Sequence, residues 1–188
     1  MADVSAAPND DLRVHLTVLR CQAGDEHAFR SLLDEFGGRT LRYLRGLVDD
    51  DADDVQQEVW LSVYRSIASL ANPGAFRTWL FSTTRRRAID HLRRRRRERE
   101  LLVDSADAAE EAVDVPADDS TIGDIDRGAL GDVLAGLPPP QREVLLLRFQ
   151  DELSYAEIAL VVGCPVGTVK TRIHHAKRKL QDLLRSES

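Results

Sequence analysis

Apolar residues recur at helical spacing in two separate blocks of the chain. The first block begins with Leu12, Leu16 and Leu19, which share one face of a predicted helix that stops near Gly24. Asp25 follows at a position that favours an N-cap, because its carboxylate can accept hydrogen bonds from the first free N–H groups of the next helix. The apolar positions of that second helix are Phe29, Leu32, Leu33, Phe36, Leu41, Leu44 and Val48.

Two more predicted helices complete the first block. Gly37 and Gly38 are expected to weaken the middle of the second helix. The third helix begins in the acidic run 49–54, whose charges suit a helix N-terminus. Its apolar face holds Val55, Val59, Val63 and Ile67. Asn-Pro-Gly at 72–74 indicates a loop. A fourth helix is expected from about Phe76, with apolar positions at Trp79, Leu80, Ile89 and Leu92.

The second block predicts three helices. The prolines at 138–140 can open the first of them, since proline is tolerated in a first turn. Ser154 and Glu157 have the spacing of a capping box for a second, short helix. Gly163 suits the position after that helix. Pro165 then starts a long last helix, which is expected to reach about Leu184.

Residues 101–126 separate the two blocks and show no periodicity. This stretch has no aromatic residue and few large apolar ones, so it cannot bury enough surface to offset the entropy of ordering. The predicted fold is therefore all-α, with two small helical domains joined by an acidic flexible linker. The expected boundaries are a disordered tail at 1–10, a first domain at 11–99, the linker at 100–128 and a second domain at 129–186.

Charge is distributed unevenly along these segments. The net charge of −6 is unusual for a protein that binds nucleic acid. Residues 85–99, however, hold nine arginines, whereas residues 101–126 hold nine acidic residues and no Lys or Arg. Residues 170–179 are basic again. Two basic patches separated by an acidic segment predict two nucleic-acid contacts joined by a tether.

The last two predicted helices form a helix-turn-helix. At 100° per residue, the inward stripe of the last helix holds Val169, Ile173, Ala176 and Leu180. The opposite face holds Gly167, Thr171, His174, His175 and Arg178, flanked by Lys170 and Arg172. Hydrogen-bond donors, a small residue and positive charge are what entry into a major groove requires. The alternative is the solvated face of an ordinary three-helix core.

Other classes of function find little support in the sequence. Cys21 and Cys164 lie far apart without neighbouring ligands, so we expect two reduced thiols and no metal site. The five histidines form no ligand pattern, and neither a phosphate-binding loop nor a nucleophile motif is present. We therefore expect no enzyme activity and no cofactor. No apolar run is long enough to cross a bilayer, and residues 1–11 lack the order of a signal peptide, so we expect no membrane insertion and a cytoplasmic location.

The second block resembles region 4 of the extracytoplasmic-function (ECF) sigma factors of RNA polymerase. The resemblance lies in Leu-Ser-Tyr-Ala-Glu-Ile-Ala at 153–159, Gly-Cys-Pro-Val-Gly-Thr-Val-Lys-Thr-Arg at 163–172, and Leu-Pro-Pro-Pro-Gln-Arg at 137–142. It implies that the last helix recognises the −35 promoter element. The implied −35 contacts are Thr168, Lys170, Thr171, Arg172, His174, His175 and Arg178.

The first block is similar to region 2 of the same family. Asp-Asp-Val-Gln-Gln-Glu-Val at 53–59 resembles the segment that docks on the clamp of core RNA polymerase, although a valine stands in the family's aromatic position. The implied polymerase contacts are Asp53, Asp54, Gln57 and Glu58. Segments 76–81 and 88–94 resemble the parts that open the duplex and hold one strand at the −10 element. The implied −10 contacts are Leu70, Asn72, Phe76, Trp79, Arg85, Arg86, Arg87, Asp90, Arg93 and Arg94.

The resemblance implies a sigma factor whose partners are core RNA polymerase (clamp and flap), promoter DNA and an anti-sigma factor. Arg86 stands where the family often has an asparagine, which changes the expected reading of the −10 sequence. The acidic linker would thread the polymerase cleft, or serve only as a tether. The alternative is a free-standing helix-turn-helix regulator that acts without polymerase. That alternative explains the second domain but not the polar and arginine-rich helices of the first.

Overall fold

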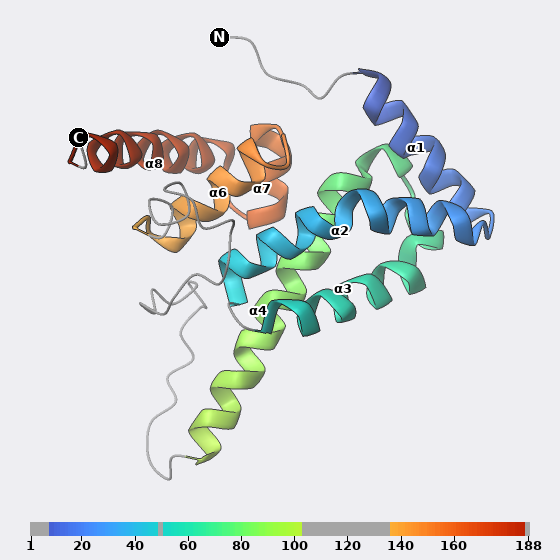
Figure 1. Ribbon diagram of the computed structural model, residues 1–188, viewed down its shortest axis with the longest axis horizontal. Helices are drawn as coiled ribbons and strands as arrows, with labels where there is room; N and C mark the ends of the chain where they lie inside the picture. Colours follow the sequence, from blue (N-terminus) through green and yellow to red (C-terminus); the bar gives the residue numbers. More distant parts are fainter. Residues whose placement is uncertain (1–7, 49–50, 103–135, 187–188) are drawn as a thin grey trace.

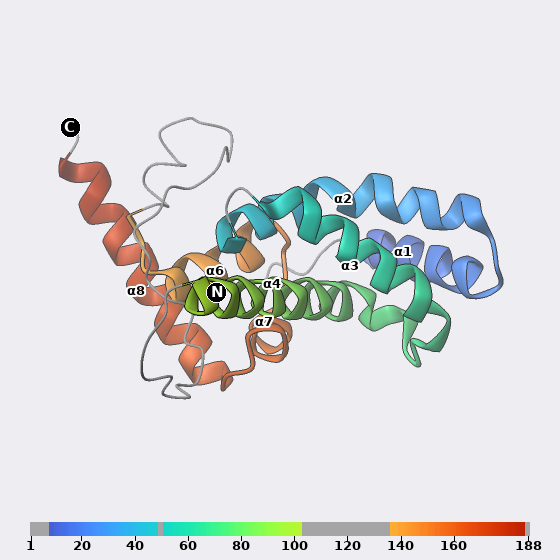
Figure 2. The ribbon, with the colours of Figure 1, turned by 90° about the horizontal axis from the view of Figure 1, so that it is seen from below.

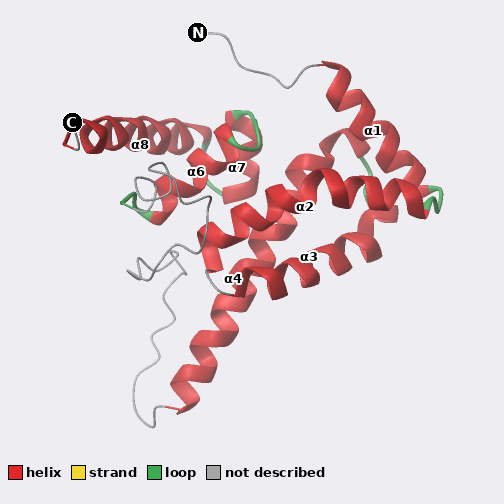
Figure 3. Ribbon diagram, in the orientation of Figure 1, coloured by secondary structure: helices red, strands yellow, loops and turns green. Residues whose placement is uncertain are grey.

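The computed structural model describes residues 8–48, 51–102 and 136–186, and the regular elements of these residues are all helical (Figures 1 and 3). The first four helices are α1 (Pro8–Gln22), α2 (Glu26–Val48), α3 (Ala52–Ser66) and α4 (Phe76–Leu102). Short 3-10 turns, η2 (Ile67–Ser69) and η3 (Pro73–Ala75), lie between α3 and α4. The last three helices are α6 (Pro139–Phe149), α7 (Tyr155–Val162) and α8 (Val166–Ser186). The all-α prediction is confirmed.

The ends of α1 and α2 follow from local chemistry. Gly24 has a φ of +89°, a left-handed conformation that glycine adopts without steric cost, and it ends α1. Asp25 Oδ1 then accepts hydrogen bonds from the N–H groups of His27, at 2.9 Å, and Ala28, at 3.1 Å. The predicted cap is confirmed.

The glycine pair in α2 does not interrupt the helix. Gln56 Nε2 donates a hydrogen bond to the carbonyl of Gly37 at 2.6 Å, and the Thr40 hydroxyl donates to the same carbonyl at 3.0 Å. Both are side-chain hydrogen bonds that add to the backbone hydrogen bonds of α2, and they stabilise the helix at a position where glycine has low helix propensity. Gln56 therefore joins α3 to the backbone of α2 at Gly37.

The core of the first domain lies between α1, α2, α3 and α4. Val55, Val59 and Val63 are at most 1% exposed, as the predicted apolar face requires. Phe36 and Phe76 meet edge to face with ring centroids 5.5 Å apart. Burial of each such side chain contributes roughly 1.5–3 kcal/mol to folding.

The second core joins the two predicted domains. Leu145, Leu146, Ile158, Val169 and Ile173 pack together among α6, α7 and α8. Tyr43 of α2 and Phe81 of α4 belong to the same cluster, and their rings meet edge to face at 5.5 Å. Accordingly, α6 packs on α2 and α7 packs on α4 (Figures 1 and 2). The sequence did not predict this packing.

Two element boundaries extend past the expected ones. Helix α1 begins at Pro8, inside the segment expected as a tail, and α4 continues to Leu102, past the expected end of the first domain. Residues 1–7 and 103–135 lie outside the described residues, so the tail and the linker remain predictions. Among the described helices, none is long and apolar enough to cross a membrane.

Candidate nucleic-acid interface

Helices α7 and α8 form the predicted helix-turn-helix. The Ser154 hydroxyl accepts a hydrogen bond from the Glu157 N–H at 3.3 Å, and Glu157 Oε2 accepts one from the Ser154 N–H at 2.8 Å. Gly163 ends α7 with a φ of +71°, where a side chain would be strained. This capping box and this turn set the angle at which α8 leaves the domain.

The inner and outer faces of α8 agree with the predicted phase. Val169, Ile173 and Ala176 are at most 3% exposed, and they fasten α8 to α6 and α7. The residues predicted to contact the −35 element lie on the other side. Lys170, Thr171, His174, His175 and Arg178 are exposed, and Thr168 and Arg172 are half-buried. The structure therefore brings all seven together along one helix.

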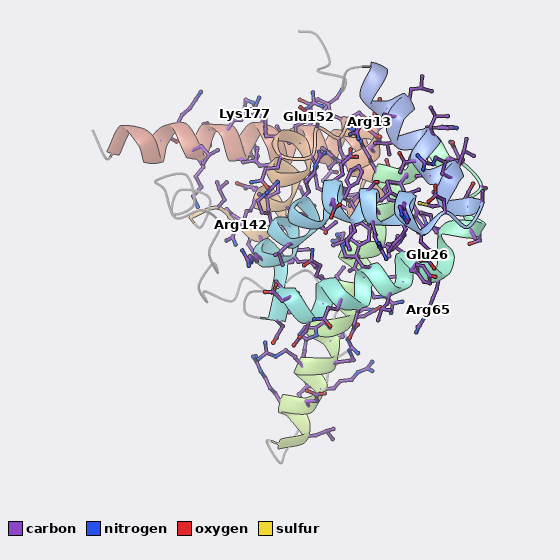
Figure 4. All side chains as sticks on the ribbon, turned by 45° about the vertical axis from the view of Figure 1, so that its right-hand side comes forward. Arg13, Glu26, Arg65, Arg142, Glu152 and Lys177 are labelled. Atoms are coloured by element: carbon purple, nitrogen blue, oxygen red, sulfur yellow. The ribbon has the colours of Figure 1, made fainter. Side chains whose placement is uncertain are left out.

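Small residues keep the N-terminal part of this outer face open. No atom lies within 4 Å of the position that a Cβ would occupy at Gly167. The Thr171 hydroxyl donates to the Gly167 carbonyl at 3.0 Å, which leaves its lone pairs facing outward. Lys177 projects from the same helix (Figure 4), but its ammonium lies 5.0 Å from the centroid of the Phe149 ring. Lys177 therefore also packs within the domain.

The arginine-rich helix α4 presents the second basic surface. Its C-terminal part continues beyond α3 (Figure 1), and its side chains project in several directions there (Figure 4). Arg86, Arg93 and Arg94 are exposed. Arg87 is half-buried, and it donates a hydrogen bond to the Ser62 hydroxyl of α3 at 3.1 Å. Asp90 is also half-buried.

Asp51 attaches the base of this basic segment to the start of α3. Its Oδ2 atom is 3.0 Å from His91 Nε2 and also accepts a hydrogen bond from Arg95. The hydrogen bond with His91, followed by the charge of Arg95, lowers the pKa of Asp51 below its usual value. A charged carboxylate thus orients two side chains of α4, a role that the sequence reasoning missed.

Hydrogen bonds stabilise the loop at 70–76 at its start and near its middle. Gln22 Nε2 donates to the carbonyls of Ile67, at 3.0 Å, and Leu70, at 2.8 Å. The Asn72 side chain accepts a hydrogen bond from the Gly74 N–H at 3.0 Å. Asn72 is exposed, whereas Leu70 and Trp79 are half-buried.

Phe76 requires a correction to the expected −10 contacts. Phe76 was expected among the residues that face DNA, but its side chain is 0% exposed. Its ring packs against Phe36 and lies 6.0 Å from the Trp79 ring, because the loop closes over the core at this point. In this structure Phe76 supports the loop and does not face solvent.

The polar residues predicted to contact polymerase lie together on α3. Asp53, Asp54 and Gln57 are exposed, and Glu58 is half-buried. Glu58 accepts two hydrogen bonds from Arg94 Nη2, both at 3.0 Å. The structure thus pairs a residue expected to contact polymerase with one expected to contact DNA, so the two surfaces adjoin.

Two apolar residues extend this surface of α3. Leu61 and Tyr64 are 54% and 57% exposed, and they lie at helical spacing from Asp54 and Gln57. The sequence reasoning missed them. The available signal was their phase, because neither belongs to the stripe formed by Val55, Val59 and Val63.

A third feature that the sequence reasoning missed lies between the domains. Glu143 is 3% exposed, and its Oε1 accepts hydrogen bonds from Tyr43 Oη and Arg85 Nε, both at 2.8 Å. Burial, and then the charge of Glu143, raises the pKa of Tyr43 well above its usual range, so its hydroxyl remains a donor. Burial opposes the charge of Arg85, but Glu143 raises the pKa of Arg85 overall. Arg85 is therefore bound to the second domain in this structure.

A capped helix-turn-helix beside a domain with an arginine-rich helix defines a two-domain, all-helical DNA-binding protein. In the part of the chain that the structure describes, no group of three or more His, Cys, Asp or Glu side chains could hold a metal ion. The site therefore consists of donors, positive charge and exposed helical faces, which suit binding to DNA and to a protein partner.

Comparison with known proteins agrees with this class. The Sigma-70 region 2 family matches residues 32–98, and the Sigma-70, region 4 family matches residues 127–180. The ECF RNA polymerase sigma-E factor of Haemophilus influenzae is 31% identical over 174 residues, covering 88% of this chain and 92% of that protein. The RNA polymerase sigma-H factor of Pseudomonas aeruginosa is 35% identical over 185 residues, covering 89% and 94%.

Solved structures show the same fold. CnrH in complex with the cytosolic domain of CnrY matches with a TM-score of 0.64 at 23% identity, covering 93% of this chain and 99% of that chain. The sigma factor RpoE of Bartonella quintana, solved with the anti-sigma factor NepR, matches with a TM-score of 0.63 at 24% identity, covering 85% and 97%.

The chain belongs to the ECF sigma factors of RNA polymerase. Both regions expected from the sequence are matched, and the similarity to relatives extends over both domains. The chain is thus a transcription initiation factor that acts with core RNA polymerase at specific promoters. The alternative of a free-standing regulator is not favoured, because such a protein has no need of region 2.

Proposed function

We propose that the two domains divide promoter recognition, with α8 reading the −35 element and α4 with the loop at 70–76 acting at the −10 element. The observation that carries this proposal is the outer face of α8. It presents five exposed polar or basic residues while its opposite face is buried. A helix fixed in this way can enter the major groove without rearrangement.

Residues of α8 are suited to different contacts. Lys170, His174 and His175 are assigned to base edges or phosphates, because their side chains are exposed on the outer face. Thr171 is assigned to the same contacts as an acceptor, because its hydroxyl already donates to the Gly167 carbonyl. Arg172 and Arg178 are assigned to the DNA backbone, where a guanidinium can bind phosphate oxygens in a fork. The capping box at Ser154 supports this function indirectly by holding the turn.

At the −10 element, the arginines of α4 supply a basic path for a separated strand. The proposed path runs along Arg85, Arg86, Arg87, Arg93 and Arg94, with Asp90 on the same helix and the loop residues Leu70, Asn72 and Trp79 at its start. Arg86 replaces the amide that the family often has here, so we expect a −10 preference that differs from the common one.

Polymerase binding is assigned to the exposed surface of α3. Asp53, Asp54, Gln57 and Glu58 supply polar contacts to the clamp, and Leu61 and Tyr64 add apolar area beside them. By the same family relationship, an anti-sigma factor is proposed to cover the polymerase-binding surfaces. The chain itself catalyses no reaction under this proposal, requires no cofactor and acts in the cytoplasm.

The proposal is tested by in vitro transcription with bacterial core RNA polymerase on a genomic promoter library, with and without this protein. Discrete transcripts that require both components establish sigma activity, and their start sites define both promoter elements. Transcripts that are absent, together with no binding to core polymerase, would contradict the proposal and favour the free-standing regulator.

Matched variants then test the assigned residues. Lys170→Ala should lower transcription from the mapped promoters between roughly fivefold and a hundredfold, which corresponds to about 1–3 kcal/mol for a base contact. Lys179→Ala removes the same charge from an exposed position of the same helix and should have little effect. Arg86→Asn should change the −10 sequences selected while leaving the −35 sequences unchanged.

A further inference from the structure

The two domains are held against each other by three sets of polar contacts. In the Glu143 cluster, defined as Tyr43, Arg85 and Glu143, a nearly buried carboxylate of α6 accepts hydrogen bonds from α2 and α4. The other two sets are smaller, and in one of them Arg39 Nη2 also donates to the Gln150 carbonyl at 3.3 Å. Arg39 Nε donates to Asp151 Oδ1 at 3.0 Å, and the Thr78 hydroxyl donates to Glu157 Oε1 at 3.1 Å. Each bond joins region 2 to region 4.

Close apolar packing accompanies these bonds. Leu146 is 2% exposed, and a methyl group at Gly46 would lie 2.8 Å from its Cδ1 atom. Carbon atoms do not pack at that distance, so a side chain at position 46 would require the buried Leu146 side chain to shift. Helices α2 and α6 are therefore in close apolar contact at Gly46 and Leu146.

This arrangement occupies residues assigned to promoter DNA. Arg85 lies on the proposed −10 path, but here its guanidinium is bound by Glu143 and only 21% of its side chain is exposed. The outer face of α8, in contrast, remains exposed. The contact thus affects the −10 surface while leaving the −35 surface open.

Distance adds a second restriction. The −35 and −10 elements are named for positions about 25 base pairs apart, which is roughly 85 Å along B-DNA at about 3.4 Å per base pair. A compact chain of this length has a radius of gyration of about 16 Å and a diameter of roughly 40 Å. Regions 2 and 4 therefore cannot reach both elements while α6 and α7 lie on α2 and α4. Residues 103–135 can span at most about 110 Å, so the covalent chain permits separation.

We propose that this packing is an autoinhibited state of the sigma factor, in which the Glu143 cluster holds region 4 on region 2. The cluster must break before the two regions can occupy separate sites on polymerase and promoter. The inference rests on the proposed function, because it assumes that each region has its own site. When only a fraction of molecules is open, the apparent dissociation constant for core polymerase rises by the inverse of that fraction.

Two independent variants are expected to open the molecule. Glu143→Gln keeps the size of the side chain but removes the charge that Arg85 requires, so opening returns Arg85 to water. Gly46→Ala places a methyl group 2.8 Å from Leu146 Cδ1, so the buried Leu146 side chain must shift and the packing of α6 on α2 is weakened. Their matched controls are Glu152→Gln, at an exposed glutamate of the same domain, and Gly38→Ala, where the nearest atom, Arg42 Nη1, is 3.7 Å away.

The experiment combines small-angle X-ray scattering of the full-length chain with titration of core RNA polymerase. Both opening variants should have a larger radius of gyration than the wild type and the controls. Glu143→Gln should also bind core polymerase about tenfold more tightly, since loss of a charged hydrogen bond shifts an equilibrium by at least that factor. Gly46→Ala should change the affinity in the same direction, because it weakens the apolar packing of the same closed state. Unchanged circular dichroism would show that the helices remain folded.

The possible outcomes separate the two proposals. Variants that expand without any gain in affinity, or a wild type that is already as extended as the variants, would overturn autoinhibition. A wild type that fails to bind core polymerase would overturn the proposed function, whereas the scattering comparison would still decide whether the Glu143 cluster closes the chain.

Discussion

Asp151 is a single residue whose ionisation bears on the packing of the two domains. It lies between α6 and α7, and its side chain is 1% exposed. Oδ1 accepts a hydrogen bond from Arg39, but Oδ2 has no hydrogen-bond partner among the described residues. Burial raises the pKa of Asp151 to about 6, against the lowering effects of Arg39, Arg42 and Arg77, which face it from α2 and α4. Arg39 and the other two arginines therefore offset only part of the free-energy cost of burying the charged Asp151 carboxylate.

We expect the stability of the wild type to decrease between pH 5 and pH 7.5. Because the pKa of Asp151 is about 6 in the folded chain and 3.8 when unperturbed, the folded state binds the proton more tightly, and its advantage is lost as pH rises through 6. The loss attributable to Asp151 is about 1 kcal/mol over this range. Urea unfolding of the wild type and Asp151→Asn at both pH values measures it. Equal pH dependence in the two proteins would contradict the assignment.

At the scale of the helices, the sequence predicted most of the structure because the signals are local. Apolar phase identified the buried stripe of Val55, Val59 and Val63, and capping chemistry identified Asp25 and Ser154. The face expected from Leu12, Leu16 and Leu19 is 43–56% exposed, whereas α1 buries Val14 and Val18. The predicted helix ends were less accurate at positions that have no capping residue. Helix α4 continues to Leu102, beyond its apolar positions, and Arg96 Nε and Glu100 Oε1 form an exposed i, i+4 pair at 2.7 Å in this part.

The capping box of α7 should contribute to the stability of the second domain. Ser154→Ala removes the acceptor for the Glu157 N–H, so we expect a loss of about 1 kcal/mol in the free energy of unfolding. Ser31→Ala is the matched control, because the Ser31 hydroxyl is exposed inside α2 and donates only to the His27 carbonyl. Its effect should stay within about 0.5 kcal/mol. Equal losses in urea titrations of the two variants would show that the capping box is unimportant.

At the scale of the whole molecule, the sequence could not predict how the domains pack. Tyr43 and Phe81 occupy ordinary positions of amphipathic helices, and nothing in their spacing shows that they face α6 and α7 rather than the core of their own domain. Glu143 and Arg85 are 58 positions apart, so no periodicity connects them. The same limit applies to the site. Exposure of α8 was predictable from phase, whereas the pairing of Arg85 with Glu143 and of Glu58 with Arg94 depends on tertiary contacts.

The distribution of charge over the molecule leads to a final prediction about DNA binding. The net charge of −6 repels DNA over distances set by salt, whereas the basic residues of α8 attract it locally. Each phosphate contact releases about one counterion, so the logarithm of affinity for −35 duplex DNA should fall with the logarithm of salt concentration, and Arg178→Gln should reduce the slope by about 0.9.

Arg65→Gln provides the control for this measurement. It makes the same change in net charge at an exposed position of α3, far from α8 (Figure 4). If net charge governs binding, both variants will lower affinity by a similar factor and leave the slope unchanged. If Arg178 contacts a phosphate, only Arg178→Gln will change the slope. Fluorescence anisotropy with labelled duplex at several salt concentrations distinguishes the two cases, because the slope counts contacts while the intercept also includes long-range repulsion.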